Sequence, residues 1–198
     1  IIFKLLDYRF NHKVFISKIV QDSWNNKCHK KIGTIIYNPV AIKQISNAKN
    51  HQKKPFKILF VGRLLDFKNA ILIVKAIKEI IKTNSNVLLS IIGDGPEFDS
   101  IKHFVKCNNL DKNVLFFGYC NNVTSFYEEA NVLVFPSIWS SGLPLVALEA
   151  SQYDIALVSS NIKGIREHIE SDYNGLLFKS NSHKDLAQKL ISLINNPK

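Results

Sequence analysis

The sequence predicts an α/β fold, a doubly wound parallel sheet over residues 57–198, with a remnant of a preceding domain before it. Two observations predict this fold. Short apolar runs recur along that part of the chain, which is typical of parallel strands buried on both faces. Segments with helical apolar spacing separate the runs, so strands and helices alternate. Right-handed crossovers would bring every strand-to-helix loop to the carboxyl edge of the sheet, where such folds bind ligands.

Six strands and six helices are expected in strict alternation. The strands are short apolar runs, and they comprise residues 57–62, 87–93, 113–118, 132–137, 155–160 and 175–178. The helices comprise residues 69–82, 96–105, 123–129, 144–152, 165–169 and 183–194. In the first helix Ala70, Ile73 and Ile77 recur on one face, as a core-facing helix requires. Pro96 and Pro144 stand near helix starts, where the missing N–H of proline does no harm.

The segment before residue 57 is expected to belong to another unit. KVFIS at 13–17 and TIIYNPV at 34–40 predict two further strands around a polar helix. The stretch that follows is polar and has no apolar periodicity, which favours a linker. We therefore expect the end of an incomplete N-terminal domain at 1–43, a linker at 44–56 and the main domain at 57–198.

Composition limits the class of protein. The 198 residues are 46% apolar and 21% charged, which is typical of a globular chain with a substantial core. The net charge of +10 favours either a phosphate-bearing partner or a surface of solvated lysines. The lysines lack the arginine and aromatic interleaving of an RNA-binding sheet, so nucleic acid is not expected.

The cysteines and apolar runs predict the compartment. Cys28, Cys107 and Cys120 have no C-x-x-C or zinc-ligand spacing, which favours reduced thiols in the cytoplasm. No apolar run approaches the ~18 residues that a membrane-spanning helix needs. The chain starts at Ile1 without an initiator methionine or a signal peptide, so we expect a piece of a longer protein.

Three loops of the predicted sheet edge carry candidate ligand groups. In GRLLDFKN, Gly62 allows close backbone approach, and Arg63 and Lys68 supply two cations. The same cations could simply be solvated, and the loop matches neither a Walker A motif nor G-x-G-x-x-G. GDGPE at 93–97 is more typical of a turn and a helix start than of a ligand site. Gly118 and Tyr119 end the third strand, where a base could stack; the alternative is an exposed loop aromatic.

The fourth loop is the most informative. In FPSIWSSGLPLVALEA, Gly142 precedes a helix whose first free amides, near Leu145 and Val146, are suited to bind phosphate. Helical side chains lean toward the N-terminus, so Glu149 could accept hydrogen bonds from sugar hydroxyls there. An ordinary exposed glutamate is the alternative interpretation.

The motifs together resemble a known family. FVGRL…K, IIGDGPE, VLFFGY, ANVLVFPS, GLPLVALEA and NGLL occur in the order and spacing of the donor domain of family-4 retaining glycosyltransferases, over roughly residues 30–198. This family has the Rossmann-like GT-B fold. The resemblance implies transfer of a sugar from a nucleoside-diphosphate sugar to a glycan or lipid-linked acceptor, with retention, and a role in surface polysaccharide biosynthesis. It also implies that residues 1–43 end an acceptor domain.

The resemblance also assigns roles to residues. Arg63 and Lys68 would hold the donor diphosphate together with the amides near Leu145 and Val146, and Glu149 would bind the ribose. The donor-binding set as a whole comprises Gly62, Gly118, Tyr119, Ser141, Gly142, Leu145, Val146 and Glu149, and the catalytic set comprises Arg63, Lys68 and Glu149. No cofactor beyond the donor substrate is expected. No metal-ligand cluster is apparent, which is consistent with cationic side chains serving where other enzymes use a metal.

The sequence departs from the family pattern at several positions. Ser141 stands where the first glutamate of the E-x7-E pair is expected, and Arg166 replaces the proline of G-x-P-E, leaving Gly164 and Glu167. A truncated or degenerate nucleotide-sugar binding subunit is therefore the alternative to an enzyme. A generic nucleotide binder, in which Glu149 does not matter, is a third interpretation. The missing acceptor domain is expected in cis or as a partner chain, with peripheral contact at the inner face of a membrane.

Overall fold

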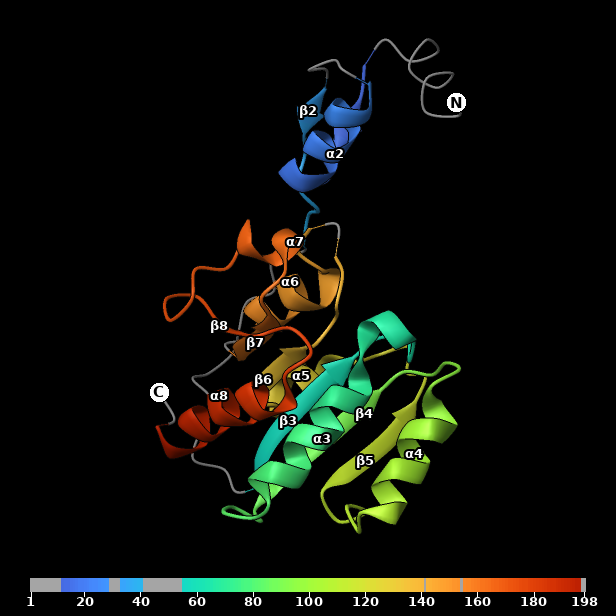
Figure 1. Cartoon of the computed structure of the whole chain (residues 1–198), viewed down its shortest axis with the longest axis vertical. Coiled ribbons are helices and arrows are strands. Elements are labelled where there is room, and N and C mark those ends of the chain that lie inside the picture. The colour runs from blue at the N-terminus through green and yellow to red at the C-terminus, as the bar shows by residue number, and fades with distance from the viewer. Residues whose placement is uncertain (1–11, 29–32, 41–54, 141, 154, 197–198) are drawn as a thin grey trace.

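The computed structural model describes residues 12–28, 33–40, 55–140, 142–153 and 155–196. Its main feature is a six-stranded parallel sheet (Figure 1). The strands lie in the order β5-β4-β3-β6-β7-β8, with bounds β3 Phe56–Val61, β4 Val87–Ile92, β5 Val114–Gly118, β6 Val132–Phe135, β7 Ala156–Ser160 and β8 Leu176–Phe178. This confirms the predicted doubly wound parallel sheet and its six strands.

Helices cover both faces of this sheet (Figure 1). They are α3 Ala70–Ile80, α4 Phe98–Cys107, α5 Thr124–Glu129, α6 Leu145–Ser151, α7 Lys163–Arg166 and α8 His183–Asn195, with a short 3-10 turn, η1, at Asp66–Lys68. Successive side chains of a strand point to opposite faces. Ile58 and Phe60 accordingly pack with α3, α4 and α8, whereas Leu59 packs with α5 and α6.

The strand order places the ligand edge. After β3 the chain adds β4 and β5 on one side, then returns to pair β6 against β3 and adds β7 and β8 on the other side. The order therefore reverses between β3 and β6, and the loops that follow these two strands diverge. Such switch points are where open parallel sheets bind ligands. The loops at this edge are the ones that carry the predicted site residues.

Two predictions about local structure need correction. The helix expected at 165–169 is α7 at Lys163–Arg166, because residues 168 and 169 only close a turn onto the carbonyl of Ile165. Upstream, β1 Val14–Phe15 and β2 Thr34–Ile35 form a two-stranded parallel sheet, joined by α2 Lys18–Cys28. Both strands are shorter than the predicted 13–17 and 34–40, since their ladder ends with the bond from the Ile36 N–H to the Phe15 carbonyl.

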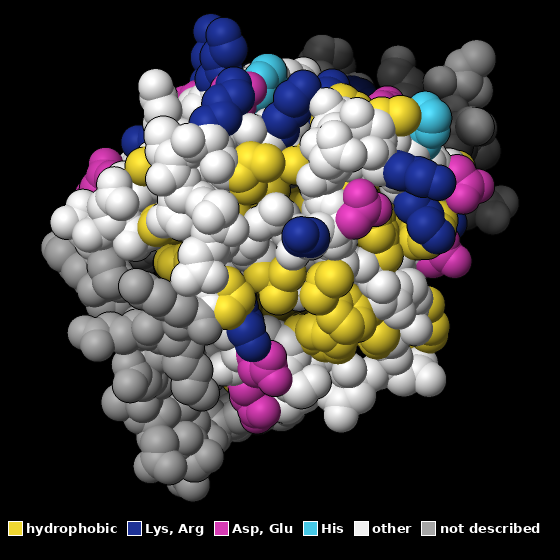
Figure 2. Space-filling view, turned by 90° about the horizontal axis from the view of Figure 1, so that it is seen from below, with side chains coloured by type: hydrophobic (Ala, Val, Ile, Leu, Met, Phe, Trp, Pro, Cys, Tyr) yellow, Lys and Arg dark blue, Asp and Glu magenta, His cyan; other side chains and the backbone are white. Residues whose placement is uncertain are grey.

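The predicted linker at 44–56 falls outside the described residues up to position 54, and Phe56 already begins β3. The boundaries 1–43, 44–56 and 57–198 therefore stay predictions. In the described ranges, no helix combines the length and apolarity needed to cross a membrane. Figure 2 views the end of the molecule away from β1, α2 and β2, and its lysines and arginines are scattered rather than gathered into one patch.

Candidate functional site

The loops after β3 and β4 are held together by their backbones. The N–H of Gly62 donates to the Ile92 carbonyl at 3.0 Å, and the N–H of Gly93 donates to the Gly118 carbonyl at 2.7 Å. A Cβ on Gly93 would lie 1.9 Å from the Gly62 oxygen, and one on Gly95 would lie 2.5 Å from the Leu64 oxygen. The GDG loop is therefore built from glycine so that neighbouring backbones can touch, which agrees with its expected structural use.

A cavity of about 770 Å³ opens beside these loops. Three predicted donor-binding residues, Gly62, Arg63 and Tyr119, line it. An apolar wall of the cavity is formed by Val61, Ile92 and Val123. A carboxyl group and a thiol come from Asp94 and Cys120. Tyr119 is 77% exposed, so its ring is available to a ligand. The cavity thus combines an apolar surface with a cation at its border, as a nucleotide would require.

A second cavity, of about 360 Å³, adjoins the first at Val123. It contains two further predicted residues, Leu145 and Glu149, both from α6. Asn121 and Gln152 add amide groups to its lining. Five of the predicted residues are therefore divided between two neighbouring cavities at one edge of the sheet.

Glu149 is held in place by a residue that the sequence did not single out. The hydroxyl of Tyr127 donates to Glu149 Oε2 at 2.8 Å, and the Tyr127 ring stacks on Tyr153 with centroids 5.2 Å apart. Burial, followed by the hydrogen bond to Glu149, raises the pKa of Tyr127. Glu149 is thus oriented by the core, and a carboxylate has further acceptor positions for a ligand. The only sequence signal for Tyr127 was its place in the helix expected at 123–129.

Lys68 occupies a half-buried position in η1. Its ammonium lies 5.1 Å from the ring centroid of Phe135, at the end of β6, and 5.5 Å from that of Phe67. Burial lowers the pKa of Lys68. A partly desolvated cation is attracted to aromatic faces and to anions more strongly than one in bulk water. Lys68 lines neither cavity, whereas exposed Arg63 lines the larger one.

The loop before α6 is packed rather than open at Gly142. A Cβ there would lie 3.0 Å from the Ser17 Cβ, and one on Gly164 would lie 2.3 Å from the Ser140 oxygen. Pro144 is the N-cap of α6 and Leu145 its first residue, so the amides of Leu145 and Val146 lie in the first turn of α6.

Three predicted residues need separate mention. Val146 is partly buried, and its carbonyl accepts weakly from the Tyr127 hydroxyl at 3.5 Å. Gly118 supports the GDG loop through its carbonyl and lines neither cavity. Ser141 lies outside the described residues. Within the described ranges, no three His, Cys, Asp or Glu side chains are grouped to hold a metal, and the metal-free expectation stays a prediction.

Replacing Tyr127 with phenylalanine is expected to lower the free energy of unfolding by about 1 kcal/mol, because the partly buried Glu149 carboxylate loses a hydrogen-bond donor. Urea denaturation followed by circular dichroism measures the change. Tyr119→Phe is the matched control, since that hydroxyl belongs to a mostly exposed side chain and its loss should be neutral. Equal stability of Tyr127→Phe and the unmodified chain would contradict the assigned role.

Several known proteins are similar to this chain in sequence. A family model described as "Glycosyl transferases group 1" matches residues 41–198. An uncharacterized glycosyltransferase of Methanocaldococcus jannaschii is 30% identical over 92% of this chain and 49% of its own length. The UDP-Gal:alpha-D-GlcNAc-diphosphoundecaprenol alpha-1,3-galactosyltransferase of Escherichia coli is 28% identical over 73% of this chain and 38% of its own length. The chain thus spans about half or less of the length of these relatives.

Solved structures confirm the fold. A mutant of S. aureus TarM, in complex with fondaparinux, alpha-GlcNAc-glycerol and UDP, superposes with a TM-score of 0.87 at 23% identity, covering 98% of this chain and 39% of TarM. Anabaena HepE in complex with UDP gives a TM-score of 0.86 at 19% identity, covering 98% of this chain and 57% of HepE.

Proposed function

The chain belongs to the group 1 glycosyltransferases, and from this premise we propose that it forms the donor-binding part of an enzyme that transfers a sugar from a nucleoside-diphosphate sugar. The observation that carries the proposal is that Arg63 and Glu149 line two cavities that share Val123 at the carboxyl edge of the sheet. Lys68 adds a second cation over the end of β6. A sugar nucleotide carries a diphosphate that cations bind and hydroxyls that donate to an acidic acceptor.

Each residue has a chemical role in this proposal. Arg63 and Lys68, with the first-turn amides at Leu145 and Val146, stabilise the negative charge that grows on the diphosphate as it leaves. Glu149, oriented by Tyr127, accepts hydrogen bonds from the ribose hydroxyls.

The remaining predicted residues shape the donor site. Tyr119 and the apolar wall of the larger cavity receive the base. Gly62 and Gly118 allow the backbone to come close to the base. Gly142 is assigned to the donor sugar, and so is Ser141, which lies outside the described residues. No protein nucleophile is assigned.

The donor and acceptor are proposed from the relatives. The titles of the TarM and HepE structures name UDP, and the E. coli enzyme is named for a UDP-sugar donor and a diphosphoundecaprenol-linked acceptor. We accordingly take a UDP-sugar as donor and a lipid-linked or glycan acceptor, with retention, in surface polysaccharide synthesis at the cytoplasmic face of a membrane. The acceptor domain, of which residues 1–43 are the end, is supplied in cis or by a partner chain.

One observation favours a second function. Ser141 carries no charge where the family pattern has a glutamate, so a non-catalytic nucleotide-sugar binding subunit is the alternative. The two functions share the donor site and differ only in turnover. A chain that binds a sugar nucleotide but transfers no sugar when an acceptor domain and acceptor are supplied would favour the alternative.

Nucleotide binding tests the proposal directly. UDP at ~100 times its dissociation constant is expected to raise the melting temperature by about 5 to 10 °C, since a ligand that binds only the folded state stabilises it. The shifts with GDP and ADP show how much the base contributes to binding. The difference between the shifts with UDP and UMP measures the contribution of the second phosphate, and it should be large if Arg63 and Lys68 bind that phosphate. The absence of any shift with all nucleoside diphosphates would overturn the proposal.

A further inference from the structure

A carboxylate from the far end of the chain holds the start of α2. Glu167, just after α7, accepts from the Lys18 N–H at 2.7 Å through Oε1 and from the Ile19 N–H at 3.2 Å through Oε2. Ser17 Oγ accepts from the next amide, that of Val20, at 3.3 Å. The first amides of a helix have no acceptor inside the helix, and a negative charge beside them is stabilising. α2 has no acidic residue in its own first turn, so Glu167 supplies that charge.

A second contact joins the same two regions. The hydroxyl of Tyr37, from the segment after β2, donates to Glu167 Oε1 at 3.1 Å. The Tyr37 ring meets the ring of His168 edge-on, with centroids 5.1 Å apart. Burial acts to raise the pKa of Glu167, but hydrogen bonds from Lys18, Ile19 and Tyr37 outweigh it and lower that pKa. The carboxylate is therefore ionised at neutral pH, in the form that accepts all three bonds.

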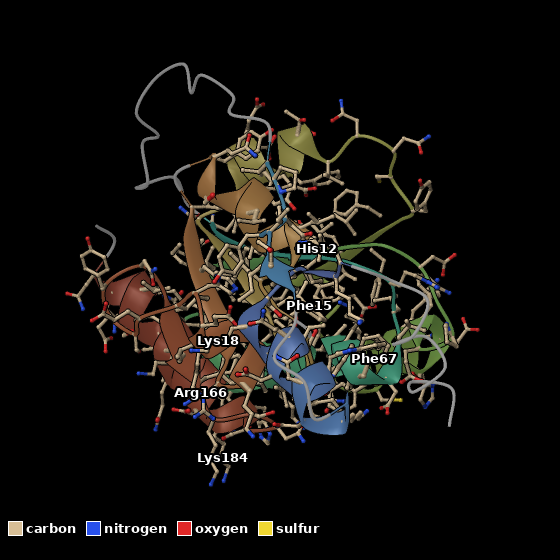
Figure 3. The ribbon with its side chains drawn as sticks, turned by 90° about the horizontal axis from the view of Figure 1, so that it is seen from above. His12, Phe15, Lys18, Phe67, Arg166 and Lys184 are labelled. Atoms are coloured by element: carbon tan, nitrogen blue, oxygen red, sulfur yellow. The ribbon has the colours of Figure 1, made fainter. Side chains whose placement is uncertain are left out.

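The same helix, α7, also packs against the loop that leads into α6. Gly164 lies so close to Ser140 that a Cβ would come within 2.3 Å of its carbonyl oxygen. On the other side of this loop, Gly142 touches Ser17, which is fully buried at the start of α2. The loop is thus enclosed between α7 and the beginning of α2. Figure 3 shows Lys18 and Arg166, the neighbours of these contacts in the chain, on the same side of the molecule.

We propose that Glu167 is a positioning residue that clasps α2 to α7 and thereby keeps the loop before α6 in shape. One carboxylate binds two amides of α2 and the hydroxyl of Tyr37, and Ser140 and Gly142 of the loop lie against Gly164 of α7 and against Ser17. That this loop faces the donor sugar rests on the proposed function; the clasp itself does not. Glu167 touches no reacting atom and acts only through the loop.

Amide hydrogen exchange of the full chain, followed by NMR, tests the clasp. In Glu167→Gln, the amides of Lys18 and Ile19 should exchange about tenfold faster, because the loss of a charged cap frees the first turn of α2. Exchange in β3 and α3 should not change. Glu170→Gln is the matched control, since Glu170 is exposed in the same segment. Unchanged exchange at Lys18 and Ile19 in Glu167→Gln would overturn the proposal.

Two further measurements keep the result decisive. Tyr37→Phe removes one of the three bonds and should give a smaller increase at the same amides; no increase would count against the clasp, even if Glu167→Gln fails to fold. The UDP melting shift, measured on the same samples, separates the two proposals. Faster exchange in Glu167→Gln, together with no UDP binding by the unmodified chain, would support the clasp and overturn the donor site. UDP binding with unchanged exchange at Lys18 and Ile19 would support the donor site and overturn the clasp.

Discussion

Gly93→Ala is expected to lower the free energy of unfolding by about 3 to 5 kcal/mol, a large part of the stability of a typical domain. Gly93 ends β4 with a φ of +132°, a conformation that residues with a side chain rarely adopt. The added Cβ would also lie 1.9 Å from the Gly62 oxygen. Because this obstacle is the backbone of the neighbouring strand end, no side-chain rotation can relieve it.

Gly118 allows the cost of backbone strain to be measured apart from the cost of a steric clash. Gly118 has a φ of +65°, but a Cβ on it would meet nothing within 4 Å. Gly118→Ala should therefore cost only the ~1 kcal/mol of left-handed strain. Urea denaturation of both variants measures the difference. If Gly93→Ala costs no more than Gly118→Ala, the close approach of the β3 and β4 ends does not stabilise the fold as described.

Much of this edge could be predicted because its determinants are local. Continuous apolar runs separated by helical spacing indicate buried parallel strands, and the strand-to-helix loops then share one edge. GDGPE was recognised as turn chemistry from its residues alone. The structure explains the two glycines of this segment, because Gly93 and Gly95 each lie against a carbonyl of the neighbouring loop.

The contacts that orient the site could not be predicted in this way. Tyr127 and Glu149 stand 22 positions apart on different helices, and Lys18 and Glu167 are 149 positions apart. Apolar periodicity says which face of a helix is buried, but not which hydroxyl meets which carboxylate across the core. The division of the predicted residues between two cavities depends in the same way on tertiary packing.

Removing either cation of the proposed diphosphate site is expected to weaken UDP binding by about 10- to 100-fold, the loss typical of a hydrogen bond to a charged group. Arg63→Ala and Lys68→Ala are compared with Lys78→Ala, which removes the same charge from an exposed position near the end of α3. Isothermal titration calorimetry measures the three affinities. Lys78→Ala should bind as the unmodified chain does. If Arg63→Ala and Lys68→Ala also bind normally, the diphosphate lies elsewhere.

If Lys68 binds the diphosphate, the affinity for UDP should depend on pH. Burial lowers its pKa, so in the free chain it loses its proton at a lower pH than an ordinary lysine. Only the protonated form attracts a diphosphate, so affinity should fall as pH rises through the lowered pKa of Lys68. Lys68→Arg keeps its charge at that pH and should flatten the profile. If Lys68→Arg retains the same slope, another group titrates, and Lys68 does not hold the second phosphate.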